Sequence, residues 1–327
     1  MKEINKKFAL NLQLFNNTNV TTDTGLSNEM KVFYSDYLID NAKPLLVHDQ
    51  FAQKHPIPKN GGKTIEFRKY SPFAKALTPI TEGVTPAGRK LETSTITAEI
   101  AQYGDYVELS DVLLLTAIDN NLVEATKLLG NQAGETLDTI TREVLAGGTN
   151  VHYSGSKSAR SALTETDKLT VDDCFKAARF LKTQKAQKID GYYVAIIHPD
   201  VAYDLMRSED WVNAAQYAGS SQLFEGEIGR VAGIRFVEST EAKIFAKAAG
   251  EKDVYATLVL GANAYGVTEV EGGGLQHIVK QLGSAGTADP LNQRATVGWK
   301  AIKTAERLVE GFMIRIESCS SFDSGAN

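Results

Sequence analysis

The stretch that decides the fold is 63-KTIEFRKY-70, read together with 93-TSTITAEIAQYGDYVEL-109. In both segments apolar and polar residues alternate, and this period of two is typical of half-buried β-strands. The apolar positions of the pattern are Ile65, Phe67, Ile96, Ala98 and Ile100. The connection between them, 77-LTPITEGVTPAGRKL-91, contains two prolines and two glycines. The sequence therefore predicts a long two-stranded arm with a broad tip.

Such an arm needs support from outside itself. A two-stranded hairpin is marginal in water, because three or more strands or a packing partner are usually required. Its open edges also invite pairing with other strands. We therefore expect something beyond the two strands to cover the apolar face of the arm.

The composition describes an ordinary water-soluble chain. It has 327 residues, 43% of them apolar, and 35 Lys and Arg against 40 Asp and Glu, for a formal net charge of −5. This charge argues against a surface devoted to wrapping nucleic acid, although local contact with DNA remains compatible with it. Cys174 and Cys319 lack CxxC partners, which indicates two reduced thiols. No apolar run reaches the roughly 20 residues that span a bilayer.

Helical signals occur in several places outside the arm. Residues 1–25 are rich in Asn and Thr and read as a flexible start, and 26–47 shows a helical pattern closed by Pro44. Residues 118–146 carry an apolar stripe at spacings of three and four, followed by Gly147-Gly148, which predicts a helix about 40 Å long. Thr170 and Asp173 are spaced as a capping box.

Strands dominate the second half of the chain. In 191-GYYVAIIHPDVAYDLM-206 a buried strand leads through His198-Pro199-Asp200 into a helix. Residues 275–282 and 294–305 look like a strand pair, and 311–318 alternates as a final strand. Helices and strands are interspersed, so the expected class is α+β.

No common catalytic signature is present. The segment 60-NGGKT-64 lacks the earlier glycine of a phosphate-binding loop, and none of the five histidines forms a zinc-type pair. An enzyme with Asp200 or Glu225 in a cleft is the weakest hypothesis, since no motif supports it. We predict no catalytic, cofactor-binding or metal site, and no enzymatic activity.

Three segments together resemble a known family. They are residues 77–111, residues 191–206 followed by 226–240, and residues 282–308, of which the third is the most specific. In this order they are similar to major capsid proteins of tailed bacteriophages (Caudovirales), in the group typified by the coliphage N-four capsid protein. That group has the Hong Kong phage capsid fold, shared with encapsulins.

The resemblance implies a division of the chain. Residues 1–60 would form an N-terminal arm and 61–110 the extended loop. Residues 111–169 and 301–327 would form the peripheral domain with its spine helix, and 170–300 the axial domain. The final strand would return to the peripheral sheet.

The resemblance also implies assembly rather than turnover. Pentamers and hexamers of the chain would close into an icosahedral shell around double-stranded DNA, in a virion assembled in the bacterial cytoplasm. Scaffolding, portal and decoration proteins would be partners, and no membrane would be involved. The apolar side of the extended loop would be covered by a neighbouring subunit. The candidate inter-subunit residues are Ile65, Phe67, Arg68, Glu82, Arg89, Lys90, Ile96 and Ile100. The alternative is an encapsulin-type nanocompartment shell.

Overall fold

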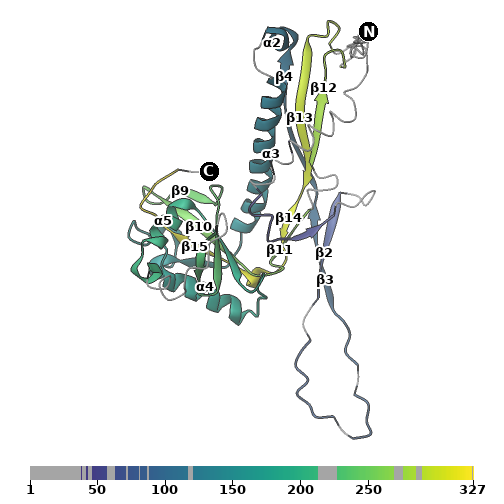
Figure 1. Ribbon diagram of the computed structural model, residues 1–327. Helices are drawn as coiled ribbons and strands as arrows, with labels where there is room; N and C mark the ends of the chain where they lie inside the picture. The colour runs from purple at the N-terminus through teal and green to yellow at the C-terminus, as the bar shows by residue number, and fades with distance from the viewer. Residues whose placement is uncertain are drawn as a thin grey trace, which may run out of the picture.

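Figure 1 shows three parts of the chain: a long upright, a compact lobe beside its lower end and an arm that extends below. The computed structural model describes residues 38, 42, 46–56, 63–70, 73–80, 82–86, 88–116, 121–212, 227–268, 275–284, 289–325 and 327. The flexible start predicted over 1–25 lies outside these residues, as does most of the helix predicted over 26–47. Within that helix, Leu38 and Ala42 are described, and both are helical and buried.

The upright consists of one long helix packed on a three-stranded sheet. Helix α3 (Asn121–Ala146) has 26 residues, about 39 Å at 1.5 Å per residue. It ends before Gly147-Gly148, as the sequence predicts. The sheet has the order β12-β13-β4, with β12 (Leu275–Lys280), β13 (Arg294–Lys303) and β4 (Ala101–Ser110) all antiparallel. The predicted pairing of the segments around 275–282 and 294–305 is confirmed.

The core of the upright lies between helix and sheet. Small and branched side chains of α3 face alternate residues of the strands, which is why a 3.6-residue stripe and a two-residue pattern fit together. The main contributors are Leu129, Ala133, Leu137, Leu275, Val297, Trp299 and Ala301. A short helix, α2 (Asp111–Thr116), follows β4.

The lobe is built on a seven-stranded sheet. Its order is β5-β15-β10-β6-β8-β7, and β9 (Ile244–Ala249) also pairs with β10. The strands are β5 (Val151–Tyr153), β6 (Tyr193–Ile197), β7 (Glu227–Val231), β8 (Ile234–Glu238), β10 (Lys252–Leu260) and β15 (Met313–Ser318). Short 3₁₀ turns lie at Ser154–Ser156, Arg160–Ala162 and Glu310–Phe312.

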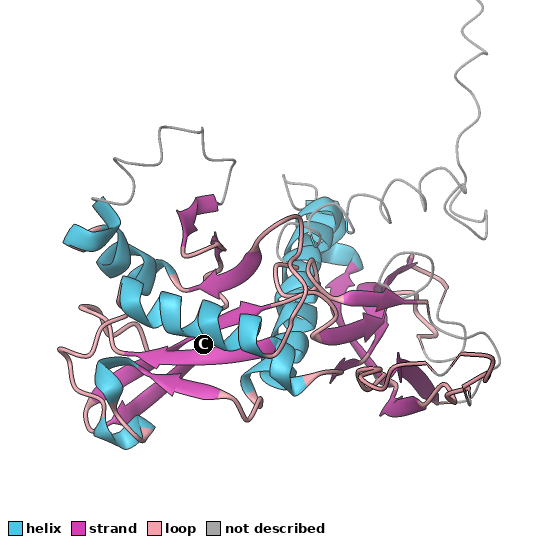
Figure 2. Ribbon diagram, turned by 90° about the horizontal axis from the view of Figure 1, so that it is seen from below, coloured by secondary structure: helices cyan, strands magenta, loops and turns pink. Residues whose placement is uncertain are grey.

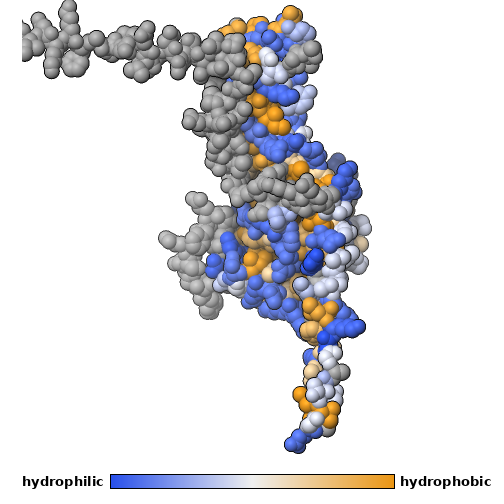
Figure 3. All heavy atoms as spheres, turned by 90° about the vertical axis from the view of Figure 1, so that its right-hand side faces the viewer, coloured by the Kyte–Doolittle hydropathy of each residue, from blue (hydrophilic) through white to orange (hydrophobic). Residues whose placement is uncertain are grey.

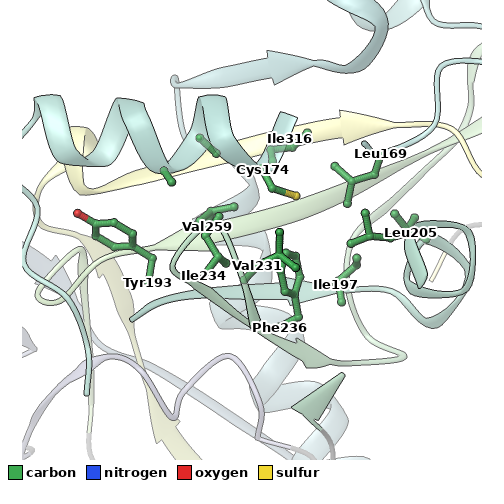
Figure 4. Close-up of a cluster of buried hydrophobic side chains, with 14 of the residues drawn as sticks. Leu169, Cys174, Tyr193, Ile197, Leu205, Val231, Ile234, Phe236, Val259 and Ile316 are labelled. Atoms are coloured by element: carbon green, nitrogen blue, oxygen red, sulfur yellow. The ribbon is translucent and has the colours of Figure 1, made fainter. Parts of the chain in front are cut away.

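Two helices, α4 (Val171–Thr183) and α5 (Pro199–Met206), cover the lobe sheet. In the view from below, α4 runs across the strands (Figure 2). Figure 4 shows Cys174 from α4 and Leu205 from α5 pointing toward the strand residues Ile197, Val259 and Phe236. Fully buried apolar side chains of this size each contribute about 1.5–3 kcal/mol to stability.

Local signals correctly predicted how these two helices begin. The Thr170 hydroxyl accepts a hydrogen bond from the Asp173 N–H, and the Asp173 side chain accepts one from the Thr170 N–H, which completes the capping box. Pro199 occupies the first turn of α5, and the Asp200 N–H donates to His198 Nδ1 at 3.2 Å. Burial lowers the pKa of His198, which keeps Nδ1 available as an acceptor. The His-Pro-Asp tripeptide is therefore a strand-to-helix joint.

A third, smaller sheet links the upright to the arm. It has the order β1-β11-β14, from β1 (Gln53–His55), β11 (Tyr265–Thr268) and β14 (Ala305–Arg307). The arm itself is the pair β2 (Thr64–Tyr70) and β3 (Thr93–Glu99), in register from Thr64↔Glu99 to Tyr70↔Thr93. The predicted hairpin is therefore confirmed, but it is shorter than expected.

The segment 93–109 changes partner halfway along. Up to Glu99 it pairs with β2, and from Ala101 onward it pairs with β13 as β4. The prediction of a single hairpin over the whole segment was wrong, because alternation reports a half-buried strand and not the identity of its partner.

The sheets also differ from the division expected at residue 300. Strand β13 spans that boundary and lies in the upright with α3. Strand β15, expected to return to the sheet of the spine helix, instead pairs with β10 and β5 inside the lobe. All six residues of β15 are buried, including Arg315 and Glu317, which pair with each other at 2.7 Å. The final strand predicted over 311–318 is therefore confirmed, and both of its faces are covered.

Both cysteines are free and buried. Burial raises the pKa of Cys174 to about 12 and that of Cys319 to about 11. Because the thiolate is the reactive form, we expect the native protein to resist alkylation by iodoacetamide near neutral pH. Mass spectrometry should find both thiols modified after denaturation, and rapid modification of the native protein would contradict this prediction.

Candidate inter-subunit surface

The base of the arm is packed against its own chain. Ile65, Phe67 and Ala98 are 5%, 1% and 4% exposed, and they cluster with Leu308. The Phe67 ring meets the His55 ring edge-on at a centroid distance of 4.9 Å. It also lies against Gly266, where a Cβ atom would stand 2.4 Å from the ring. A side chain at residue 266 would therefore displace Phe67.

This packing corrects one expectation. The apolar face at the base of the arm was predicted to need a neighbouring subunit, and that was wrong, because the turn at Leu308 and strand β11 cover it. Ile65 and Phe67 are buried in this way, and Ile96 and Ile100 are half-buried in the same cluster. Little apolar surface remains there for a second molecule.

The far end of the arm, unlike its base, has apolar side chains that are exposed. We call residues 71–92, between β2 and β3, the tip loop; its described part forms neither helix nor strand. It extends away from the rest of the chain (Figure 1), and hydrophobic side chains stand among polar ones along it (Figure 3). Its exposed apolar residues are Phe73 at 59%, Leu77 at 83%, Ile80 at 76%, Val84 at 61% and Leu91 at 62%.

An exposed apolar series of this kind indicates a binding surface. Single exposed apolar residues are normal, but a contiguous series on a protruding loop marks an interaction site. Loops of this length without regular structure are also uncommon unless they are functional. The candidate surface is therefore the tip loop rather than the base of the arm.

The predicted charged residues Arg68, Glu82, Arg89 and Lys90 are all exposed. Arg68 lies on β2 and the other three lie in the tip loop. Arg89 has a role that sequence reasoning missed, because its guanidinium donates to the carbonyl oxygens of Ala74 and Lys75 on the opposite limb. These hydrogen bonds hold the two limbs of the tip loop together.

Replacing Arg89 with Ala should loosen the tip loop without unfolding the protein. Charge-assisted hydrogen bonds to backbone carbonyls order a loop, and the contact lies far from both cores. We expect faster chymotryptic cleavage at Phe73, Leu77 or Leu91 and an unchanged unfolding midpoint. Arg89→Lys, which retains charge but not the forked donor geometry, is the control. Unchanged cleavage of the Ala variant would show that the bonds do not order the loop.

A buried polar cluster fixes the segment that precedes the arm. His48 donates its backbone N–H to Asp138 Oδ1 at 2.7 Å, and its Nδ1 lies 2.6 Å from Asp138 Oδ2. Asp49 accepts from the Thr141 hydroxyl at 2.6 Å and pairs with Lys303. We call these five residues the buried joint.

The joint connects three elements distant in sequence: residues 46–56, α3 and β13. The Tyr265 hydroxyl on β11 also donates to the His48 carbonyl, and every one of these side chains is buried. Nothing in the sequence pointed to the joint, because its members occur as isolated polar residues within or beside apolar patterns.

The described residues offer no evident reactive centre. Among them, no group of three or more His, Cys, Asp or Glu side chains is arranged to hold a metal ion. The Asp200 carboxylate accepts from the hydroxyls of Tyr255 and Ser324, so it anchors the C-terminal segment. Glu225, the other residue of the enzyme hypothesis, lies outside the described residues. In the described part of the chain, no helix has the length and apolar character needed to cross a membrane.

Comparisons with known proteins agree with this architecture. The chain is similar to the capsid of cyanophage P-SCSP1u at 18% identity and a TM-score of 0.62, over 83% of this chain and 87% of that one. For the capsid of Ralstonia phage GP4 the values are 15% and 0.63, over 85% and 87%. A virus-like particle from Pyrococcus furiosus is less similar in fold, at 10% and 0.51, over 88% and 99%. No curated protein sequence matches.

At these identities the structural likenesses establish the fold, which is that of phage major capsid proteins. The family comes from the sequence itself. The model of the family described as "Phage capsid protein" matches residues 116–283, just over half of the chain. That range covers α3, β12 and the lobe without its strand β15. The chain therefore belongs to the phage capsid protein family and is a structural subunit of a phage capsid.

Proposed function

We propose that this subunit forms pentamers and hexamers that close into an icosahedral shell around double-stranded DNA. The observation that carries the proposal is the tip loop, which presents exposed apolar side chains at the end of a rigidly anchored arm. Burial of such surface at many modest interfaces supplies the free energy of assembly. The packed base of the arm fixes the direction in which the tip loop points.

The parts of the chain have proposed roles in that shell. The upright with α3 corresponds to the peripheral domain, the lobe to the axial domain, and residues 1–60 to an N-terminal arm. The sheets support a boundary that places β12 and β13 with the upright and β15 with the lobe. Arg68, Glu82, Arg89 and Lys90 are proposed contacts at subunit boundaries, together with the apolar residues of the tip loop.

Further partners follow from the same proposal. Scaffolding, portal and decoration proteins would act on the shell, which would assemble in the cytoplasm of a bacterial host. The enclosed DNA would be held without sequence recognition, and the net charge of −5 fits a surface that does not wrap it tightly. The three segments at 77–111, 191–206 with 226–240, and 282–308 support placement in the coliphage N-four-type group.

The test is direct observation of the purified full-length protein. Electron microscopy and sedimentation velocity should reveal closed shells, or rings of five and six copies that convert to shells when a scaffolding protein is added. A protein that stays monomeric at high concentration, with and without scaffold, would contradict the proposal. Portal and terminase genes beside its gene would favour the phage shell, whereas an adjacent peroxidase or ferritin-like gene would favour a nanocompartment.

A further inference from the structure

Helix α4 and the turn that follows it carry a series of positive charges. Residues 174–189 contain no Asp or Glu, and every third residue from 176 to 188 is a cation: Lys176, Arg179, Lys182, Lys185 and Lys188. All five are exposed. The whole chain has a formal net charge of −5, so this concentration of positive charge is local. We call Arg179, Lys182, Lys185 and Lys188 the basic ridge.

Contacts within the subunit account for the first cation of the series and not for the ridge. Lys176 Nζ lies 2.8 Å from Asp172 and 3.6 Å from Asp173. The four cations of the ridge form no ion pair with any residue that the structure describes. Lys182 is favourable in the last turn of α4 because of the helix dipole, but like charges on neighbouring positions of a helix repel each other. The folding of the subunit therefore gives no reason for a ridge of this length.

Lys185 occupies a backbone position that favours glycine. At the end of α4 the Lys185 N–H donates to the Lys182 carbonyl and the Ala186 N–H donates to the Leu181 carbonyl, both at 3.0 Å. Lys185 itself has φ +58°. Helices commonly end in this left-handed conformation on Gly, which has no Cβ to strain it. A lysine here adds both backbone strain and an exposed positive charge.

The positive surface continues onto the hairpin of β7 and β8. Lys188 Nζ lies 4.0 Å from the place that a Cβ atom of Gly233 would take, in the turn between these strands. The exposed guanidinium of Arg230 on β7 stands 4.6 Å from the centroid of the Tyr192 ring. Asp190, two residues after Lys188, is an exposed carboxylate at this end. The cations thus follow the lower edge of the lobe in Figure 1, along α4 and the turn after it.

A row of exposed cations without paired carboxylates matches a partner with dense, repeated negative charge. Duplex DNA carries one negative charge per about 1.7 Å of its axis, and Lys and Arg bind it by releasing its counterions. Lysine suits such contacts, because its ammonium is a point charge on a flexible stem and needs no fixed geometry.

An acidic protein segment is the other partner with this charge. Protein interfaces, however, usually place aromatic or apolar anchors at their centre. The structure describes every residue of α4, and the one large apolar side chain exposed on it is Phe175, at 55%. Phe175 lies one turn before Arg179, at the end of the ridge and not at its centre. The ridge therefore favours duplex DNA.

We propose that the basic ridge binds the phosphate backbone of the enclosed duplex DNA without reading its sequence. This inference rests on the proposed function and deepens it, since it assigns the surface of the subunit that meets the DNA. It also places the α4 side of the lobe on the inner face of the shell.

Removing charge from the ridge tests the contact. Arg179→Gln/Lys182→Gln/Lys185→Gly removes three charges at exposed positions, and the glycine suits the left-handed backbone at residue 185. Fluorescence anisotropy follows a labelled duplex titrated with unassembled full-length protein over a range of salt concentrations. We expect the triple variant to bind about ten-fold more weakly or worse, with a slope of log K against log[salt] shallower by about 2–3. Lys185→Gly alone should make the slope shallower by about 1.

The matched control removes the same charge from other elements. Lys54→Gln/Lys127→Gln/Lys247→Gly changes exposed lysines of β1, α3 and β9, and Lys247 also has a left-handed φ, of +48°. The control should bind the duplex as the wild type does, and two unrelated duplex sequences should give equal affinities for the wild type. Equal losses in the two triple variants would show a general effect of net charge and would overturn the inference. Circular dichroism checks that each variant has folded.

Labelling of assembled particles tests which face the ridge occupies. A Lys182→Cys variant is treated with a maleimide on a polyethylene glycol chain too large to cross the shell, and the two native thiols stay silent because they are buried. We expect protection in closed particles and rapid labelling after dissociation. Rapid labelling of closed particles would place the ridge outside and contradict the inference.

The outcomes separate the two proposals. If the ridge variant binds the duplex as tightly as the wild type while the wild type forms shells, this inference fails and the proposed function stands. Poly-glutamate that binds as tightly as the duplex, or a loss with Phe175→Ser as large as that of the ridge variant, would assign the ridge to a protein partner and overturn the inference. If the wild type forms no particle, the proposed function fails, and the titration still decides whether the ridge binds DNA.

Discussion

Replacing residues 71–92 with an Asn-Gly turn is expected to abolish assembly while leaving the subunit folded. The turn joins Tyr70 to Thr93, which are already paired in register, and Asn-Gly favours the type I′ turn of a two-residue hairpin. The residues of the tip loop that the structure describes belong to none of its hydrophobic clusters. The unfolding midpoint should therefore stay the same, whereas no closed particle should appear by electron microscopy.

The matched control is a variant with an intact loop length but no apolar tip. Leu77→Ser/Ile80→Ser/Val84→Ser keeps the backbone and the charges of the loop, so it isolates the apolar contribution. We expect this triple variant to remain soluble and to assemble poorly. Normal shells from both the deletion and the triple variant would mean that another surface holds the subunits together.

Breaking the buried joint should instead destabilise the subunit itself. Lys303→Met removes the cation that faces Asp49, and both side chains are almost fully buried, at 0% and 7% exposed. Removing one partner of a buried ion pair costs about 3–5 kcal/mol, because it leaves an uncompensated charge away from water. We expect a large decrease in the urea midpoint of the cooperative transition that includes the upright.

A double variant identifies the cause. Asp49→Asn/Lys303→Met removes both charges and retains an acceptor for the Thr141 hydroxyl, which now donates to Asp49 at 2.6 Å. Most of the lost stability should return, since replacing a buried pair with neutral groups is often nearly neutral. If Lys303→Met unfolds at the wild-type midpoint, or if the double variant is no better than the single one, the pair does not hold the segment to β13.

The elements that the sequence predicts well are those determined by neighbouring residues. The alternation at 63–70 predicted β2, and the three- and four-residue stripe predicted α3. Thr170 and Pro199 predicted two helix starts. The local pattern is sufficient for β2 and α3, and a local capping group marks the start of α4 and of α5. The resemblance to capsid proteins added the family, which the match over residues 116–283 confirms.

The features that sequence reasoning missed depend on contacts between distant segments. The change of partner near Ile100 requires β13, and the burial of Phe67 requires Gly266 and Leu308. The joint brings Asp49 to Lys303 across most of the chain. Periodicity shows that a strand has an apolar face, but it does not show which segment covers that face.

The structure therefore changes which residues are the best candidates for contacts between subunits. Apolar residues in the sequence favoured the base of the arm, where Ile65 and Phe67 are in fact used by the subunit itself. Leu77, Ile80 and Val84 looked like ordinary residues of a long turn. Their exposure is visible only in the structure, where the described residues of the loop are all exposed.

The most direct test of the account is a cryo-electron microscopy map of the assembled particle at a resolution that shows side chains. The account predicts that density for Leu77, Ile80 and Val84 lies against a neighbouring subunit, while Phe67 stays packed on Gly266 of its own chain. A tip loop projecting freely into solvent, or folded against its own subunit in a closed shell, would contradict it.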